Sequence, residues 1–293
     1  MAFATATVTA TDTYIEPLCA LCKCASGTVQ YAYEDIKIIR CERCGLWRTC
    51  PRLPLEKLNA FYEEHYYSES IQQSGQYEQW RDRHKDVWSV NAEVVLKEAR
   101  RRNSGSGGAI SLLDVGSGHG FFLEQCVARG IHGRGIETST HAVDYAREKL
   151  KLDVRPIPLD EIPADERYDV ITLWGVLEHV PEPLQTMRQV FAHLNPGGMT
   201  WVMTPNTNAL ERYIKGAQYF NFLNKSHLTH FHRPTLRAML QKAGFQNVRR
   251  YIHWGGGTRS GPAAAAQFMA RLLCLGTELR FIGERPAGNE NPR

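Results

Sequence analysis

The sequence lacks the features that would assign it at once to a membrane, secreted or nucleic-acid-binding class. No apolar run approaches the roughly 18–20 residues that cross a bilayer, so we expect no membrane partner. The first residues have neither a basic stretch nor a long apolar core, so we expect no secretion signal and a cytoplasmic location. A net charge of +4 is too small to predict nucleic-acid binding by itself. What remains is the composition of an ordinary globular protein, with 43% hydrophobic and 23% charged residues.

Cysteine is scarce outside one short segment, which holds six of the eight cysteines between Cys19 and Cys50. In a reducing compartment such a cluster favours metal binding over disulfides. Two C-x-x-C pairs, separated by 18 residues, can bring four thiolates to one tetrahedral zinc ion. We therefore predict a structural Zn²⁺ site with no open coordination position. Its predicted ligands are Cys19, Cys22, Cys41 and Cys44.

Two further cysteines of this segment, Cys24 and Cys50, leave the ligand set open, because Cys24 lies close enough to Cys22 to replace it. A redox role is the weaker alternative, since one C-x-x-C pair would suffice for it and no thioredoxin-like strand pattern surrounds these pairs.

The chain divides into four regions by composition. We expect a flexible tail at 1–17, a zinc-ribbon-like module at 18–50, a helical lid or linker at 51–107, and a larger domain at 108–293. The helical prediction follows from apolar residues at three- to four-residue spacing, such as Leu55 and Leu58, and later Val90 and Val94. The last boundary falls after a basic, Gly/Ser-rich break at 100–108.

Beyond residue 108, apolar runs alternate with amphipathic stretches, which predicts an α/β fold with a Rossmann-like, mostly parallel, seven-stranded sheet. The expected strands are Ile110–Val115, Gly133–Glu137, Asp153–Ile157, Tyr168–Trp174, Met199–Thr204, Val248–Trp254 and Glu278–Glu284. The expected helices include Phe121–Arg129, Ser139–Leu150, Pro183–Leu194 and Pro234–Ala243. From about 206 to 232 the alternation stops, and a long interruption of this kind is often a functional insertion.

A glycine-rich turn comes directly after the first of these strands. Gly116-x-Gly118-x-Gly120 leads into the helix that starts at Phe121, which is typical of a strand-to-helix turn in a nucleotide-binding fold. The dinucleotide fingerprint would require glycine at position 121. An acid, Glu137, ends the next strand 17 residues after Gly120. It is either a ligand for two ribose hydroxyls or an exposed strand-end acid.

Four segments, LLDVGSGHG, GIE, YDVITLWGVLEHVPEP and LNPGGMTWVMTPN, occur in an order that resembles the class I S-adenosylmethionine (SAM)-dependent methyltransferases. The resemblance covers roughly residues 108–284 and implies that 108–293 binds SAM. The cysteine module and the aromatic segment after it resemble the front end of a bacterial group whose members act on small molecules, including sugars and natural products. The residues that the resemblance implies for cofactor binding are Asp114, Gly116, Ser117, Gly118, Gly120, Glu137, Thr138, Asp160, Trp174 and Val176.

Three histidines are candidates for catalysis. Methyl transfer from a sulfonium needs mainly proximity and a dry pocket, but a hydroxyl acceptor also needs a general base. His179 comes after the fourth expected strand, and His227 and His230 lie in the insertion. In the alternative interpretation each of them only forms hydrogen bonds that fix a loop or lid.

The predicted function is SAM-dependent methylation of an O, N or C atom of a small molecule, with secondary metabolites or sugars as the expected context. The motifs leave open SAM cyclisation or aminocarboxypropyl transfer, since they concern the cofactor and not the reaction. An RNA methyltransferase with a zinc ribbon is disfavoured, because Trp174-Gly-Val-Leu stands where an Asn/Asp-Pro-Pro-Tyr/Phe tetrad would lie. A non-catalytic scaffold is the least favoured interpretation. The apolar helix expected at Ala264–Leu275 packs internally or forms a homodimer contact.

Overall fold

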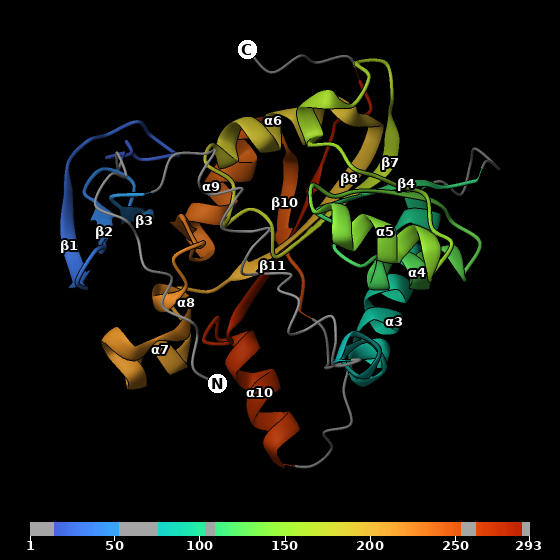
Figure 1. Cartoon of the computed structure of the whole chain (residues 1–293). Helices are drawn as coiled ribbons and strands as arrows, with labels where there is room; N and C mark the ends of the chain where they lie inside the picture. Colours follow the sequence, from blue (N-terminus) through green and yellow to red (C-terminus); the bar gives the residue numbers. More distant parts are fainter. Residues whose placement is uncertain (1–14, 53–75, 103–108, 253–261, 289–293) are drawn as a thin grey trace.

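The computed structural model describes residues 15–52, 76–102, 109–252 and 262–288, in two sheets that lie side by side (Figure 1). The smaller sheet has the order β1-β2-β3-β9, and its paired strands are antiparallel. Its first three strands come from the cysteine segment, and the fourth comes from the insertion near residue 230. Their bounds are β1 Gly27–Ala32, β2 Lys37–Cys41, β3 Trp47–Cys50 and β9 Thr229–His230.

The larger sheet has seven strands in the order β10-β11-β8-β7-β4-β5-β6, in which β11 runs opposite to the other six. This confirms the predicted Rossmann-like, mostly parallel, seven-stranded sheet. The bounds are β4 Ser111–Val115, β5 His132–Ile136, β6 Val154–Arg155, β7 Tyr168–Trp174, β8 Leu194–Pro205, β10 Gln246–Arg250 and β11 Glu278–Glu284.

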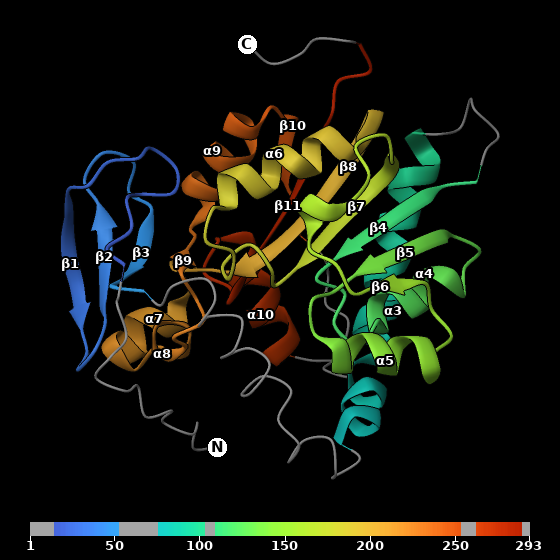
Figure 2. The ribbon, with the colours of Figure 1, turned by 45° about the horizontal axis from the view of Figure 1, so that its top comes forward.

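Alternate residues of the central strands enter two cores, one on each face of this sheet. In β4, Leu112 joins the core built with α3, α4 and α5, whereas Leu113 joins the core built with α6 and α9. Val170 and Ile171 of β7 divide in the same way. The helices are α3 Gln76–Arg102, α4 Phe121–Val127, α5 Thr140–Glu148, α6 Pro183–His193 and α9 Arg233–Ala243. Figure 2 shows α6 and α9 packed side by side.

The cysteine segment shares the second of these cores. Cys19 and Cys41 are buried in it together with side chains of α6 and α9. The Lys242 ammonium of α9 donates to the carbonyl of Leu21 at 2.7 Å, and Lys23 forms an ion pair with Glu182 at 2.6 Å. The module therefore packs directly on one face of the large domain.

Predicted and observed boundaries differ at a few element ends. The strand expected at Asp153–Ile157 is only two residues long, since it is an edge strand with prolines at 156 and 158. The strand expected at Val248–Trp254 begins at Gln246, and residues 253–254 lie outside the described residues. The helix expected from Ser139 begins one residue later, because Ser139 is its N-cap and accepts from the amide of Ala142.

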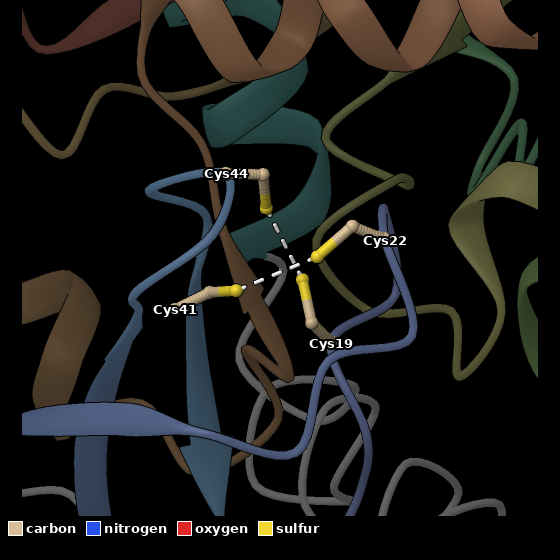
Figure 3. Close-up of side chains that lie close together, drawn as sticks. All are labelled: Cys19, Cys22, Cys41 and Cys44. Atoms are coloured by element: carbon tan, nitrogen blue, oxygen red, sulfur yellow. Dashed lines mark hydrogen bonds between the residues drawn. The ribbon is translucent and has the colours of Figure 1, made fainter.

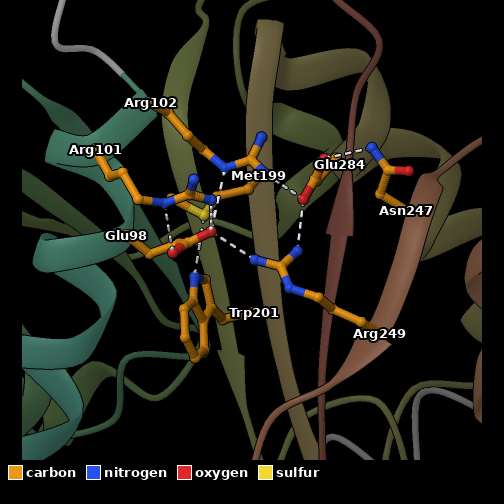
Figure 4. Close-up of polar contacts among 8 residues, drawn as sticks. All are labelled: Glu98, Arg101, Arg102, Met199, Trp201, Asn247, Arg249 and Glu284. Atoms are coloured by element: carbon orange, nitrogen blue, oxygen red, sulfur yellow. Dashed lines mark hydrogen bonds and ion pairs between the residues drawn. The ribbon is translucent and has the colours of Figure 1, made fainter.

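Helix α3 is tied to the sheet edge by an ion-pair cluster (Figure 4). Glu98 of α3 pairs with Arg249 of β10 at 2.5 Å, and Arg249 in turn pairs with Glu284 of β11. Arg102 of α3 also contacts Glu284. These contacts place the helical segment, predicted over 51–107, against the strands β10 and β11; residues 53–75 of that prediction lie outside the described residues.

The insertion that interrupts the alternation contains α7 (Leu210–Lys215), η2 (Gly216–Gln218), α8 (Phe220–Leu223) and β9. Tyr219 and Phe222 are fully buried and pack with Trp47 of β3, and Phe222 stacks on Trp47 with ring centroids 5.6 Å apart. The insertion thus forms one body with the cysteine module, and these two aromatic side chains serve packing. Helix α10 (Pro262–Leu272) lies near the start of β11. Among the described helices, none is both long and apolar enough to cross a bilayer.

Candidate functional site

The glycine loop joins β4 to α4 at the carboxyl end of the parallel strands. Gly116 and Gly120 have φ values of 63° and 80°, which favour glycine over residues with a side chain. A Cβ at Gly116 would lie 2.7 Å from Cγ2 of Val176, and one at Gly120 would lie 2.6 Å from Cδ1 of Leu152. The loop is therefore held against two neighbouring elements in a form that only glycine tolerates at these positions.

Glu137 follows directly after β5 and binds this loop. Its Oε2 accepts from the Gly118 amide at 2.9 Å, and its Oε1 accepts from the amides of Thr138 and Ser139 at 2.8 and 3.0 Å. The carboxylate thus fixes the loop to the adjacent strand. It lies where strands β4 and β5 end side by side, the edge at which Rossmann-like sheets bind ligands.

Asp114 lies behind the loop and is 2% exposed. The hydroxyl of Thr172 in β7 donates to its Oδ1 at 2.6 Å. Burial raises the pKa of Asp114 to about 7, even though this hydrogen bond opposes the shift. Asp114 therefore links β4 to β7 just before the loop begins.

Two buried polar atoms at this edge fit a polar ligand. The Ser117 hydroxyl and the Trp174 indole N–H have no hydrogen-bond partner within the described residues. Buried polar groups are normally paired, so a bound molecule with its own donors and acceptors suits the carboxyl ends of β4 and β7. Trp174 also packs on Phe122 at 4.9 Å and on Trp88 of α3 at 6.3 Å.

The structure brings most of the implied cofactor residues together at the ends of β4, β5 and β7. Asp160 is exposed in the short helix η1 (Leu159–Glu161), which follows the edge strand β6. Thr138 is exposed, and Val176 is half-buried against Gly116. The residues at the shared edge are Asp114, Gly116, Ser117, Gly118, Gly120, Glu137, Thr138, Trp174 and Val176.

A second group of polar residues lies just beyond the end of β7. Glu178 is 3% exposed, and its Oε1 lies 3.9 Å from Nε2 of His179. The rings of His179 and His227 lie 4.6 Å apart. One ligating atom from each of the three side chains lies within 4.8 Å of the others, so the group has the spacing to take a proton or a cation. We call Glu178, His179 and His227 the acid–histidine cluster.

Hydrogen bonds fix the orientation of both imidazoles. Nδ1 of His179 lies 3.0 Å from the carbonyl of Ser226, and Nδ1 of His227 lies 3.2 Å from the carbonyl of Asn221. A carbonyl only accepts, so both Nδ1 atoms carry the proton and both Nε2 atoms carry the lone pair. Each ring therefore holds the backbone of the insertion through Nδ1 and carries its lone pair on Nε2.

Burial sets the protonation of this cluster. Burial lowers the pKa of His179 to about 4 and that of His227 well below its usual value, so both rings are neutral at pH 7. Burial raises the pKa of Glu178 to about 7, partly offset by a hydrogen bond to its own backbone. Glu178 thus has the pKa that suits a general base near neutral pH. Sequence reasoning did not select Glu178, although its position directly before His179 was the available signal.

His230 lies in β9, beside the cluster rather than inside it. Its ring centroid is 6.4 Å from that of His227, and its Nε2 lies 3.0 Å from the hydroxyl of Thr49 in β3. Burial, with the nearby His179, lowers the pKa of His230 to about 3. The three histidines predicted from the sequence are therefore close together, and His230 contacts the cysteine module.

The four predicted zinc ligands converge at one point (Figure 3). The sulfurs of Cys19 and Cys44 lie 3.3 Å apart, and those of Cys22 and Cys41 lie 3.5 Å apart. A tetrahedral zinc with Zn–S bonds of about 2.3 Å places its sulfurs about 3.8 Å apart, so the group fits this ion with a small expansion.

The remaining cysteines of the segment lie outside this group. The Cys24 thiol contacts the carbonyl of Ser26 at 3.8 Å, and Cys50 ends β3. Burial opposes ionisation of Cys41, but hydrogen bonds from the Cys44 amide and the Cys22 thiol outweigh it and lower its pKa to about 6. Four sulfur ligands would leave zinc without an open position, as in structural sites.

Comparison with known proteins agrees with this geometry. A family model described as "Methyltransferase domain" matches residues 78–250, more than half of the chain. The ubiquinone biosynthesis O-methyltransferase of Bordetella pertussis is 32% identical over 128 residues, which cover 41% of this chain and 53% of that protein. The enzyme of the same name from Marinobacter nauticus is 34% identical over 151 residues, which cover 46% and 63%. The chain thus spans about half to three fifths of the length of these curated relatives.

Among solved structures, the plantazolicin methyltransferase BpumL in complex with a monoazolic desmethylPZN analog and SAH has a TM-score of 0.54 at 14% identity, covering 79% of this chain and 97% of that one. At this identity the similarity concerns the fold. The fold, the loop and the family match together define the class: the chain belongs to the methyltransferase domain family, the class I SAM-dependent methyltransferases. The cofactor of the class is SAM, and the residues at the ends of β4, β5 and β7 fit it.

Proposed function

We propose that the protein transfers the methyl group of SAM to a hydroxyl oxygen of a small-molecule acceptor. The observation that supports this most directly is the end of β7. Trp174 and Val176 adjoin the glycine loop there, and Glu178 and His179 come within a few residues. One turn of chain therefore connects the cofactor site with a buried group of bases. The curated relatives are O-methyltransferases by name, which supports oxygen as the acceptor atom.

Each group of residues has a separate role in this reaction. SAM supplies a methyl group on a positively charged sulfur. Glu137 and the glycine loop hold the cofactor, and the burial of the acid–histidine cluster keeps water from the acceptor. The carboxylate of Glu178 takes the hydroxyl proton as the new O–C bond forms and the C–S bond breaks. The single hydroxyl proton goes to Glu178, so His179 and His227 stay neutral and hold the backbone of the insertion beside the acceptor through Nδ1.

We also propose that the cysteine group holds one structural zinc ion and that residues 18–50 form a zinc-ribbon-like module beside the SAM-binding domain at 108–293. The four converging sulfurs support the first statement. The continuous sheet of β1, β2 and β3 supports the second.

The test is incubation with SAM and a panel of phenols, sugars, aliphatic alcohols and amines, with S-adenosylhomocysteine and the methylated product measured by chromatography and mass spectrometry. Methyl transfer to phenols or sugar hydroxyls is the expected result. Release of methylthioadenosine instead would indicate cyclisation or aminocarboxypropyl transfer. Tight, salt-sensitive RNA binding with methylation of RNA would replace the small-molecule proposal. A chain that binds no SAM by calorimetry would refute the function altogether.

A further inference from the structure

Thr49 of the cysteine module contacts the segment that carries two of the candidate histidines. It is 2% exposed and lies in β3. Its amide donates to the carbonyl of Leu228 at 3.0 Å, and its hydroxyl donates to the carbonyl of His227 at 2.6 Å. The same hydroxyl lies 3.0 Å from Nε2 of His230. A single residue thus fixes the backbone and one side chain of a segment about 180 residues away in the sequence.

These contacts determine the tautomer of His230. A threonine hydroxyl has one proton, and here it is donated to the His227 carbonyl, which can only accept. The hydroxyl oxygen must therefore accept from Nε2 of His230, so this ring carries its proton on Nε2 and its lone pair on Nδ1. His179 and His227 have the opposite tautomer, with the proton on Nδ1.

The contact continues from Thr49 to Glu178. The amides of Leu228 and Thr229 both donate to the backbone carbonyl of Glu178, at 2.8 and 3.1 Å. The segment from His227 to His230 is therefore held on one side by Thr49 and on the other by the residue that carries the buried carboxylate. Displacement of Thr49 would move His227 relative to Glu178.

The cysteine group lies at the start of this connection. Cys41 ends β2, Cys44 and Gly45 form the turn, and β3 begins at Trp47. Nε2 of His232 lies 3.0 Å from the Gly45 carbonyl, which ties the same turn to the end of the lid. Zinc bound by the four thiolates would fix the turn, and with it the position of β3 against β9.

We propose that Thr49 is a positioning residue of the methyl-transfer site, and that zinc in the cysteine group holds it in place. The cysteine module would then determine the positions of His227 and His230. This proposal rests on the proposed function for its catalytic meaning, but its structural content can be tested without an acceptor.

The experiment compares Thr49→Val, which removes the hydroxyl at nearly constant volume, with Thr49→Ser, which restores it. Thr28→Val is the matched control, because Thr28 lies exposed in β1 of the same module with only a 3.5 Å contact to Glu42. Long-range ¹H–¹⁵N spectra of histidine-labelled, zinc-loaded protein report each tautomer, and His230→Gln assigns the signal. We expect a single Nε2–H tautomer for His230 in the wild type, Thr49→Ser and Thr28→Val, and a mixture in Thr49→Val.

The second arm removes zinc with a mercurial thiol reagent and restores it with a thiol and added Zn²⁺. We expect the His230 signal to become that of Thr49→Val on removal and to return on reloading, while the dissociation constant of SAM changes less than about twofold, since the loop lies outside the module. With the acceptor found in the panel, we expect kcat to fall about tenfold in Thr49→Val and to recover in Thr49→Ser.

An unchanged His230 tautomer in Thr49→Val would overturn the positioning role, and an unchanged signal after zinc removal would overturn the part played by the metal. Loss of SAM binding on zinc removal would also contradict the proposal, because the module would then act on the whole domain. Absence of SAM binding in the wild type would refute the proposed function alone, since the tautomer spectra need neither SAM nor acceptor.

Discussion

The cofactor edge and the acid–histidine cluster lie at the same end of the sheet, but they are built differently. The cofactor edge uses residues at the ends of β4, β5 and β7, and its main contacts join Glu137 to Gly118, Thr138 and Ser139, at most 19 residues away in the sequence. The cluster joins the end of β7 to a lid near residue 227, and that lid in turn pairs with β3. The cofactor edge is formed by the ends of neighbouring strands, whereas the cluster forms only when the insertion and the cysteine module pack on the end of β7.

This difference indicates which part of the protein can diverge. A cofactor site made by strand ends persists as long as the sheet does. A site held by an insertion and a separate module can change its acceptor when either of them changes, without loss of SAM binding. Substitutions at the cofactor edge should change SAM affinity, and substitutions in the cluster should change the rate of methyl transfer. The largest of these effects is expected at the cluster.

Replacement of the buried carboxylate should have the largest effect. Glu178→Gln removes the group that accepts the hydroxyl proton, so we expect kcat to fall roughly 10²–10⁴-fold with the SAM dissociation constant unchanged. Steady-state kinetics with the best acceptor and calorimetry with SAM measure the two quantities. Glu161→Gln, at an exposed position in η1, is the control. A Glu178→Gln variant with wild-type kcat would show that the carboxylate is not the base.

The opposite pattern should appear at the cofactor edge. Glu137→Ala leaves the amides of Gly118, Thr138 and Ser139 without this acceptor, so we expect SAM to bind about 100-fold more weakly, equivalent to about 3 kcal/mol. Calorimetric titration with SAM measures the change. Glu148→Ala, on the exposed face of α5, should bind like the wild type. Equal affinities in all three proteins would contradict the assignment of Glu137.

Loss of one thiolate tests the metal. We expect Cys44→Ser to hold zinc at least about tenfold more weakly and to melt several degrees lower, because zinc binding contributes to folding. Metal analysis and thermal unfolding measure both quantities. Cys24→Ser should retain about one zinc per chain. Loss of zinc from Cys24→Ser with retention in Cys44→Ser would mean that Cys24, and not Cys44, is the zinc ligand.

The pH profile should report Glu178 rather than a histidine. A base with its pKa raised to about 7 is active when deprotonated, so kcat/KM should rise as the pH passes 7 and then level off. Below that value we expect a fall of about tenfold per pH unit. The imidazoles contribute no step near 6.5, since burial keeps their pKa values far lower. A midpoint between pH 4 and 5 would assign the step to His179 instead.

The smallest effect should come from the ion-pair cluster that holds α3. Glu98→Gln weakens contacts to Arg101, Arg102 and Arg249, and partly exposed pairs of this kind contribute little. We expect a loss of about 1 kcal/mol in the free energy of unfolding by urea, with SAM affinity unchanged. Glu148→Gln serves as the comparison, and a loss of SAM binding in Glu98→Gln would mean that this cluster shapes the cofactor edge.

The sequence predicted the large sheet well, because each strand is a buried apolar run and each turn has its own local signal. Gly116, Gly120 and Glu137 were identified for the same reason, since their spacing is set by the strands that carry them. Asp160 stays a prediction, because a two-residue edge strand gives no register by which to place the residues after it.

The pairing of β3 with β9 could not be predicted. A two-residue strand inside an irregular, His-rich insertion has no periodicity, and its partner lies in a different region of the chain. Thr49 could not be predicted either, because its role depends on the contact between β3 and β9, and a buried threonine in a strand is ordinary without it. Glu178 was missed because its pKa depends on burial, which comes from the lid above it.

The position of β9 late in the chain also sets an order of events during synthesis. Trp47 leaves the ribosome about 180 residues before its partner His230. At roughly 5–20 residues per second, the cysteine turn has about 10–40 seconds in which to acquire metal before the strand that completes its sheet exists. Throughout that interval β3 is an open edge strand, which is prone to pair with other chains. Zinc acquired in that interval would order the cysteine turn before β3 meets its partner strand.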